Sequence, residues 1–167
     1  MNHAHQAAVE KLLLHYQEPY RCSSYYDDVS SPLAATAFMH LVSERKFLSF
    51  ANVGLVESDD FVYIYSLPEL TESLFEQYYH EALDDGIARV DPNPNHQFSL
   101  ISVLFLCDSI SPAAASKLKK TKYSKQFTKP ESGTIDLRLA AVEVGSKKHA
   151  ANALGKSLFS IYKQAVK

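Results

Sequence analysis

The stretch that decides the fold is residues 98–107, which read Phe-Ser-Leu-Ile-Ser-Val-Leu-Phe-Leu-Cys. It is nearly all apolar and about half as long as a membrane-spanning helix, which needs about 20 apolar residues. A short run of this kind, without polar alternation, is typical of a strand that is buried on both faces. We therefore expect a doubly buried strand over residues 98–107.

The sequence after this strand predicts a parallel β-α-β unit. Ser111 and Pro112 are a typical N-cap and first residue of a helix, and residues 135–144 alternate polar and apolar positions at first, as a strand does. Two strands joined by a helix are expected to be parallel, with a right-handed crossover. A final helix is predicted over residues 149–166, where apolar residues recur every three or four positions.

The sequence before it predicts a helix, a three-stranded meander and a second helix. We expect turns over residues 43–46 and 58–60, and Gly86 as the residue that ends the second helix. The predicted ranges are 4–16 for the first helix, 33–42, 47–56 and 61–65 for the strands, and 71–85 for the second helix. The order is α-β-β-β-α-β-α-β-α. It predicts one α+β domain over residues 1–167, with helices packed on a single mixed sheet of about five strands.

The composition fits such a domain. Of the 167 residues, 46% are hydrophobic and 22% charged, so the chain can bury a core and is not intrinsically disordered. Cys22 and Cys107 form no C-x-x-C pair or disulfide framework, and residues 1–5 do not begin a secretory signal. We expect a cytoplasmic protein that does not enter the membrane.

The net charge of −2 conceals an asymmetry. Residues 1–100 hold 15 acids and 5 bases, a net −10, whereas residues 101–167 hold 4 acids and 12 bases, a net +8. Between Asp108 and Glu131 there is no acid, but there are six lysines with aromatic residues among them. Clustered lysines attract phosphates, and aromatic rings stack on bases. The alternatives are cations that offset a helix dipole, or that face the acidic half within the fold.

Two other motifs suggest different functions. Residues 44–46, Glu-Arg-Lys, with Asp27 or Asp28 upstream, resemble the acidic pair and lysine of restriction-endonuclease-like enzymes, which would use magnesium. In this reading Asp28, Glu44 and Lys46 form the site, although residues 43–46 are predicted to be a turn. Residues 150–157, Ala-Ala-Asn-Ala-Leu-Gly-Lys-Ser, loosely match a phosphate-binding loop. Against nucleotide binding, the apolar spacing places Gly155, Lys156 and Ser157 inside the last helix.

The basic half resembles a known but uncharacterised family. Residues 119–127 read Lys-Lys-Thr-Lys-Tyr-Ser-Lys-Gln-Phe and residues 136–139 read Asp-Leu-Arg-Leu. This resembles the pattern K-K-x-K-Y-x-K-x-F, then D-[IL]-R-L, of a domain of unknown function found in small prokaryotic proteins. The sequence departs from it after Phe127, where Lys129-Pro130-Glu131 replaces more apolar residues. The family has no assigned activity, so the resemblance implies no mechanism.

Our leading hypothesis is a non-catalytic binding domain with a basic anion-binding face. Its partner would be an acidic protein or a ligand that contains phosphate, and a homodimer is left open. No pattern predicts a metal ligand set, a catalytic residue or a cofactor, so none is expected. The competing hypotheses are the magnesium-dependent nuclease-like enzyme and the nucleotide-binding protein. The candidate anion-binding residues are Lys119, Lys120, Lys122, Tyr123, Lys125 and Arg138.

Overall fold

A computed structural model of the chain describes residues 1–28, 30–47, 51–146 and 148–167, with the backbone alone for residues 46, 47 and 51–53. The described helices are α1 (His3–His15), α2 (Glu72–Arg89), α3 (Pro112–Lys120) and α4 (Lys156–Ala165). The described strands are β1 (Arg21–Ser24), β2 (Leu33–Phe47), β3 (Ala51–Leu70), β4 (His96–Ile110), β5 (Ser124–Gln126), β6 (Thr134–Glu143) and β7 (His149–Ala151).

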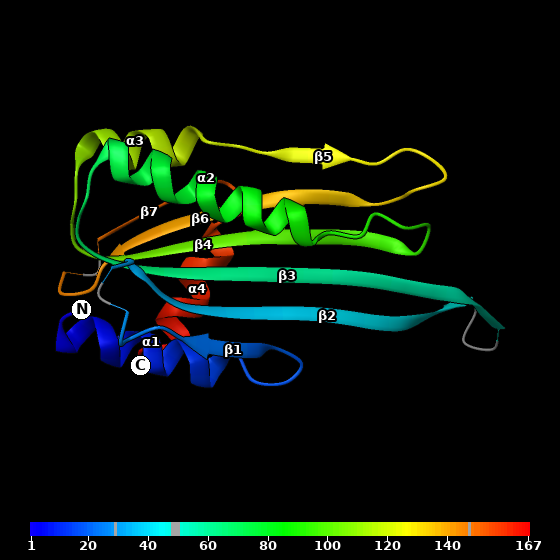
Figure 1. Cartoon of the computed structure of the whole chain (residues 1–167), viewed down its shortest axis with the longest axis horizontal. Helices are drawn as coiled ribbons and strands as arrows, with labels where there is room; N and C mark the ends of the chain where they lie inside the picture. Colours follow the sequence, from blue (N-terminus) through cyan, green and yellow to red (C-terminus); the bar gives the residue numbers. More distant parts are fainter. Residues whose placement is uncertain (29, 48–50, 147) are drawn as a thin grey trace.

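The described strands form one mixed sheet (Figure 1), in the order β1-β2-β3-β4-β6-β5, with β7 also paired to β6. β1, β2 and β3 are antiparallel neighbours, whereas β3, β4 and β6 run parallel. The predicted α+β class, the single mixed sheet and the parallel pairing of residues 98–107 with residues 135–144 are confirmed. The predicted number of about five strands is wrong, because the described sheet has seven.

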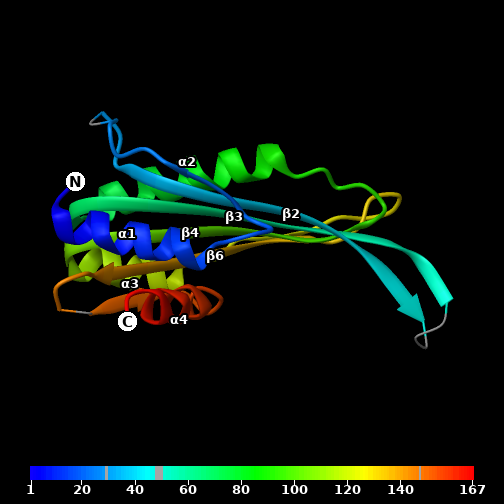
Figure 2. The ribbon, with the colours of Figure 1, turned by 90° about the horizontal axis from the view of Figure 1, so that it is seen from below.

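Helices cover both faces of the sheet (Figure 2). Side chains such as Phe105 and Leu137 pack with Phe75 of α2 and Leu118 of α3, and we call this side the α2/α3 face. Side chains on the opposite side pack with α1 and α4, and we call it the α1/α4 face. Residues 101–107 of β4 are buried throughout. The doubly buried strand that the sequence predicted is therefore confirmed.

The predicted meander is in fact one long hairpin. β2 runs through the predicted turn at residues 43–46, and β3 runs through the one at residues 58–60. Two adjacent acids, Asp59 and Asp60, are buried inside β3 instead of lying in a turn. Beyond the helices, β2 and β3 project from the body of the domain (Figure 2). The strand tolerates the two acids because both are hydrogen-bonded, as described below.

Three short strands escaped prediction. β1, within the polar segment after the first helix, and β5 are exposed at every position, so they lack the apolar alternation that marks a strand. β7 occupies the start of the predicted last helix. These strands pair at the edges of the sheet, where backbone hydrogen bonds to β2 or β6 are their main support.

Two glycines have roles other than the predicted ones. Gly86 does not end the second helix, because α2 continues to Arg89 and packs Gly86 against Ile101, where an added Cβ would lie 2.8 Å from a side-chain carbon. Gly155 does not lie within the last helix but precedes α4. There an added Cβ would lie 1.9 Å from the carbonyl oxygen of Leu139. Both glycines allow close approach to the sheet.

The segment between β7 and α4 is held by one buried amide. The side chain of Asn152 is 2% exposed and satisfies all its hydrogen-bonding groups. Its amide nitrogen donates to the carbonyls of Thr121 and Leu137, and its oxygen accepts the N–H groups of Leu139 and Gly155. This arrangement explains why the helix begins at Lys156 and not at His149.

Candidate functional site

A groove lies on the α2/α3 face, beside the helices. α2 and α3 pack over β3, β4, β6 and β7, and an open groove of about 800 Å³ remains over β1 and β2. A second hollow of about 280 Å³ shares Tyr25, Thr36, Phe38 and Arg89 with it and continues towards α2. We call the two together the β2 groove. It is the place on this face where polar and aromatic side chains converge.

The β2 groove contains a histidine that is fixed by a buried acid. His40 of β2 lies directly opposite Asp59 of β3, and its Nδ1 is 2.7 Å from Asp59 Oδ1. The His40 side chain is 57% exposed, whereas that of Asp59 is 8% exposed. Because Nδ1–H donates to the carboxylate, Nε2 is the nitrogen left to contact a ligand. Asp59 thus fixes the orientation of the imidazole, with Nε2 directed away from the carboxylate.

A chain of hydrogen bonds continues from Asp59 into the protein. The hydroxyl of Ser99 donates to Asp59 Oδ2 at 2.7 Å, and Nε2 of His96 is 2.8 Å from Ser99 Oγ. His96 Nδ1 is 2.7 Å from the carbonyl oxygen of Ser132. Both ring nitrogens of His96 are therefore in contact with a hydrogen-bonding partner. The buried chain therefore holds Asp59, and through it His40, in one orientation.

Two arginines flank the aromatic floor of the groove. The guanidinium carbon of Arg89 lies 4.6 Å from the centre of the Phe38 ring, and its Nε donates to Asp85 at 2.7 Å. Burial opposes the ionisation of Asp85, but hydrogen bonds from Arg89 and Tyr63 outweigh it and lower the pKa of this carboxyl. Arg21 is paired with Phe38 across β1 and β2. It is exposed, and no described residue forms an ion pair or a side-chain hydrogen bond with it.

The neighbouring acid, Asp60, belongs to a different cluster on the α1/α4 face. Arg138 donates to Asp60 Oδ2 at 2.6 Å and to Ser102 Oγ at 2.8 Å. Ser102 and Tyr20 also donate to Asp60, both at 2.8 Å. The side chains of Arg138 and Asp60 are 12% and 6% exposed, so this ion pair is shielded from solvent.

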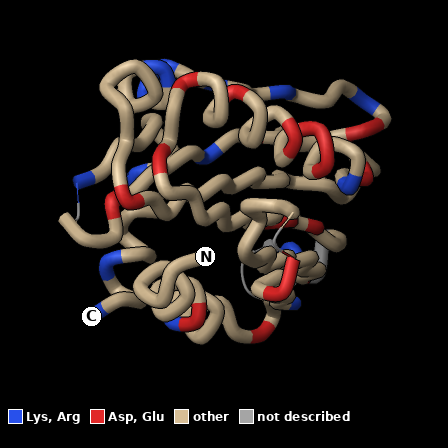
Figure 3. Tube along the Cα trace, turned by 60° about the vertical axis from the view of Figure 1, so that its left-hand side comes forward, with Lys and Arg blue, Asp and Glu red and all other residues tan. Residues whose placement is uncertain are grey.

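The predicted anion-binding residues do not form one group. Lys119 and Lys120 end α3, Lys122 follows it and Lys125 lies in β5, all exposed along one edge of the domain. Figure 3 shows this basic edge beside the acids of α2. Tyr123 is half-buried against the core. The structure does not bring Arg138 to these lysines, because its side chain lies on the α1/α4 face with Asp60.

The four lysines also differ from their neighbour Lys117, which forms ion pairs with Glu72 and Glu76 of α2. Within the described residues, no acid lies within 4.0 Å of the side-chain nitrogens of Lys119, Lys120, Lys122 and Lys125. Two pairs, Lys117 with α2 and Arg138 with Asp60, thus join the basic and the acidic half. We call the four lysines the basic edge; none has an acidic partner among the described residues, and Lys125 lies over the Phe127 ring, with Nζ 4.9 Å from its centre.

The Gly155-Lys156-Ser157 motif begins a helix, contrary to the sequence-based expectation. Lys156 is exposed and lines a depression of about 470 Å³ together with Lys119, His149 and Phe159. The N–H of Gly155, however, is bound by Asn152, and Ser157 Oγ donates to the carbonyl of Leu154. These groups of a phosphate-binding loop are therefore already engaged, whereas Lys156 extends the basic edge.

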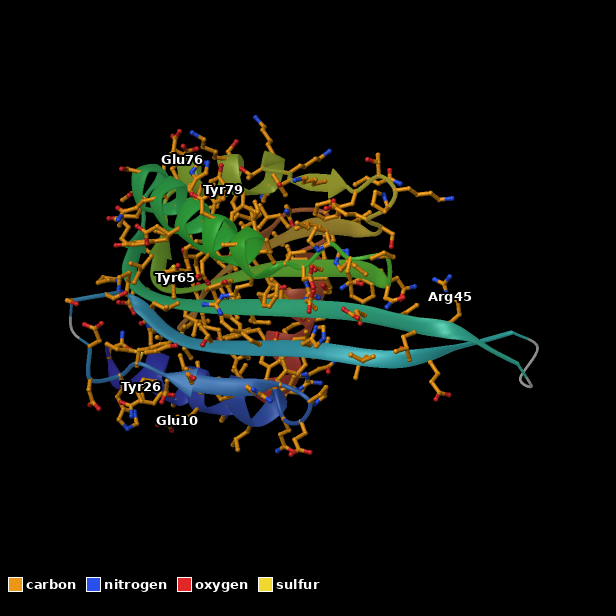
Figure 4. The ribbon with its side chains drawn as sticks, turned by 45° about the vertical axis from the view of Figure 1, so that its right-hand side comes forward. Glu10, Tyr26, Arg45, Tyr65, Glu76 and Tyr79 are labelled. Atoms are coloured by element: carbon orange, nitrogen blue, oxygen red, sulfur yellow. The ribbon has the colours of Figure 1, made fainter. Side chains whose placement is uncertain are left out.

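The residues of the nuclease hypothesis are far apart. Asp28 precedes β2, and Glu44 lies towards its other end, so the strand between them spans about 36 Å at about 3.3 Å per residue. The side chain of Lys46 lies outside the described part of the chain. Figure 4 shows the neighbouring Arg45 on the projecting hairpin, far along it from Tyr65. Asp28 and Glu44 cannot hold one metal ion in this arrangement.

Sequence reasoning missed His40 and Asp59. Residues 58–60 were expected to form a turn, and no local pattern links Asp59 to His40, because the two residues are 19 positions apart along the chain. The available signal was the alternation of a strand, since a continuous strand through residues 58–60 must send Asp59 and Asp60 to opposite faces. Among the described residues, no group of three or more His, Cys, Asp or Glu side chains is arranged to hold a metal ion.

Comparison with known proteins gives a family but no activity. A family model described as a domain of unknown function (DUF8052) matches residues 4–164. No curated protein and no solved structure matches the chain. Across the described residues, no helix is long and apolar enough to cross a membrane. The resemblance to an uncharacterised family that the sequence predicted is confirmed.

Proposed function

The chain belongs to the family DUF8052, a domain of unknown function, and we propose that it is a non-catalytic binding domain that recognises an anionic partner through its basic edge. The partner is an acidic protein surface or a molecule that carries several phosphates. The observation that carries this proposal is the contrast between Lys117, which is paired with acids of α2, and four neighbouring lysines without such partners.

The position of the lysines supports a docking role. Lys119 and Lys120 lie in the last turn of α3, Lys122 follows it and Lys125 lies in the edge strand β5. Lys156 lines a depression together with Lys119 and adds a further cation there. Lysine at a helix C-terminus stabilises the helix dipole, and lysine on an edge strand prevents strand pairing. Those two roles need only one or two cations, whereas five lysines without an acidic partner among the described residues create a potential that attracts a polyanion.

The proposal is tested by salt-dependent binding to a fluorescent single-stranded oligonucleotide and to a polyglutamate peptide. If four lysines contact phosphates of a single strand, affinity should fall on the order of 50-fold between 50 and 200 mM salt. The Lys120→Glu/Lys122→Glu/Lys125→Glu variant should lose this binding. Tight binding of the peptide alone would identify a protein partner, which also supports the proposal.

A matched control reverses three charges elsewhere. Lys11, Arg45 and Lys148 lie on α1, on the projecting part of β2 and before β7, and all three are exposed. Their joint replacement by glutamate changes the net charge equally and should leave most of the binding intact. If both variants weaken binding to the same extent, only net charge matters and the basic edge is not the site. No binding to either probe at 50 mM salt would also overturn the proposal.

A further inference from the structure

Independently of the basic edge, we propose that the β2 groove is a binding site for a small molecule that joins a phosphate or similar anionic group to a flat aromatic body. Arg21 and Arg89 would hold the anionic group, His40 would contact it through Nε2, and Phe38 with Phe61 would support the ring. These residues come from β1, α2, β2 and β3, so the site exists only in the folded domain.

The floor of the groove is aromatic and rigid. Phe38 and Phe61 are paired across β2 and β3, and their rings meet edge to face with centroids 5.6 Å apart. Tyr63 also packs against Phe38, with ring centroids 5.2 Å apart. Its hydroxyl is fixed by a hydrogen bond to Asp85. Rings held in this way offer a flat ligand contact area without loss of side-chain entropy.

Two arginines lie at the mouth of the larger hollow of the groove. Arg21 faces Phe38 from β1, Arg89 stacks on the Phe38 ring, and His40 lies two residues along β2. Asp59, the acid of the larger hollow, is buried and uses both oxygens to bind His40 and Ser99. An anionic group at the mouth therefore meets the guanidinium donors of Arg21 and Arg89, and among the described residues no free carboxylate lines the larger hollow.

Asp85, whose side chain is 45% exposed in the smaller hollow, and the buried Asp59 orient the groups that would meet a ligand. Asp85 receives Nε of Arg89 at 2.7 Å and Nη2 at 3.1 Å, which fixes the plane of the guanidinium. Asp59 fixes the ring of His40 with Nε2 free. Glu81, in the smaller hollow, accepts a hydrogen bond from Gln77 and lies at the end away from His40. Planar, pre-oriented donors of this kind recognise phosphate through paired hydrogen bonds.

The experiment compares three probes by isothermal titration calorimetry on the full chain. Phenyl phosphate contains both parts of the proposed ligand, inorganic phosphate contains only the anion, and phenol contains only the ring. We expect phenyl phosphate to bind at least tenfold more tightly than inorganic phosphate, and phenol to show no measurable binding. Equal affinity for the two phosphates, or no binding of phenyl phosphate, would overturn the proposal.

Variants locate the binding site. Arg21→Gln removes an exposed cation that has no described partner, so the fold should persist, and affinity for phenyl phosphate should fall about tenfold. Arg45→Gln makes the same change farther along the hairpin and should have no effect. Phe38→Leu keeps every cation and should remove the preference for phenyl phosphate over inorganic phosphate. If only the variant of Lys120, Lys122 and Lys125 loses binding, phosphate binds the basic edge and the groove is not a site.

Discussion

Two consecutive residues of β3, Asp59 and Asp60, each contact a basic side chain, but the clusters that they form lie on opposite faces of the sheet and differ in exposure to solvent. Asp60 faces the α1/α4 side, where Arg138 pairs with it beneath α4, and both side chains are nearly inaccessible. Asp59 faces the α2/α3 side, where a buried chain of hydrogen bonds leads to a histidine that is more than half exposed. The Asp60 cluster is enclosed within the core, and we call it the closed cluster. The Asp59 cluster opens into the β2 groove, and we call it the open cluster. Burial of an acid thus does not by itself distinguish the two clusters, whereas the solvent exposure of its basic partner does.

The largest effect is expected for the closed cluster. In Asp60→Ala, Arg138 remains buried without a carboxylate, and breaking a buried pair in this way typically costs about 3–5 kcal/mol. Urea denaturation followed by circular dichroism measures the free energy of unfolding. The double variant Asp60→Leu/Arg138→Met removes both charges and should recover much of the loss. If Asp60→Ala lowers the free energy of unfolding by less than about 1 kcal/mol, solvent reaches Arg138. The two clusters would then be equally accessible to water.

Asp59→Asn is expected to cost less, about 1–3 kcal/mol. The amide keeps one oxygen but can no longer accept hydrogen bonds from both Ser99 and His40, so one buried contact is lost. Affinity of the groove for phenyl phosphate should fall together with stability, because His40 is no longer fixed. His40→Gln, at an exposed position, should change the free energy of unfolding by no more than about 0.5 kcal/mol while also weakening binding. Unchanged binding in Asp59→Asn would show that the open cluster has only a structural role.

The local parts of this fold could be predicted from the sequence. Apolar runs and caps are readable one segment at a time, so residues 98–107, the helix after Ser111 and the parallel unit were predicted correctly. Asp59 and Asp60 were not, since two adjacent acids favour a turn. Only partners about 40 to 80 positions away, Ser99 and Arg138, make a strand possible there.

The candidate site was less predictable for the same reason. Lysine clusters are visible in a sequence, but which lysines are already paired is not. Lys117 and Arg138 resemble the residues of the basic edge, and only the structure shows that acids of α2 and β3 occupy them. The start of α4 depends similarly on Asn152, which bonds to a preceding loop and to β6. These contacts join segments that are far apart along the chain, so no local sequence pattern predicts them.

The closed cluster should also respond to alkaline pH. Burial, and then the charge of Asp60, raise the pKa of Tyr20 in the folded protein above its ordinary value of about 10. The unfolded state therefore loses the tyrosine proton first, and the stability contributed by Tyr20 is present below pH 10 and lost as pH rises above it. Urea unfolding at pH 8, 9, 10 and 11 should show this decline. Tyr20→Phe should make it shallower; an identical decline would place the alkaline sensitivity elsewhere.

The smallest change in the free energy of unfolding is expected at Tyr16. This residue tests most directly whether the cluster around Asp60 excludes water. Burial raises the pKa of Tyr16, and the nearby charge of Asp60 raises this pKa further. The Tyr16 hydroxyl nevertheless forms no hydrogen bond with any described residue. Tyr16→Phe removes a buried polar group that has no partner, so the free energy of unfolding should stay the same or rise by up to about 1 kcal/mol. Tyr20→Phe breaks a hydrogen bond to a charged acid and should cost about 1.5–3 kcal/mol. The free energies of unfolding of the two variants are measured in urea at pH 7. Each variant lacks one hydroxyl of the parent protein. Equal losses would mean that water reaches Tyr16, and the cluster around Asp60 would then be as open as the one around Asp59.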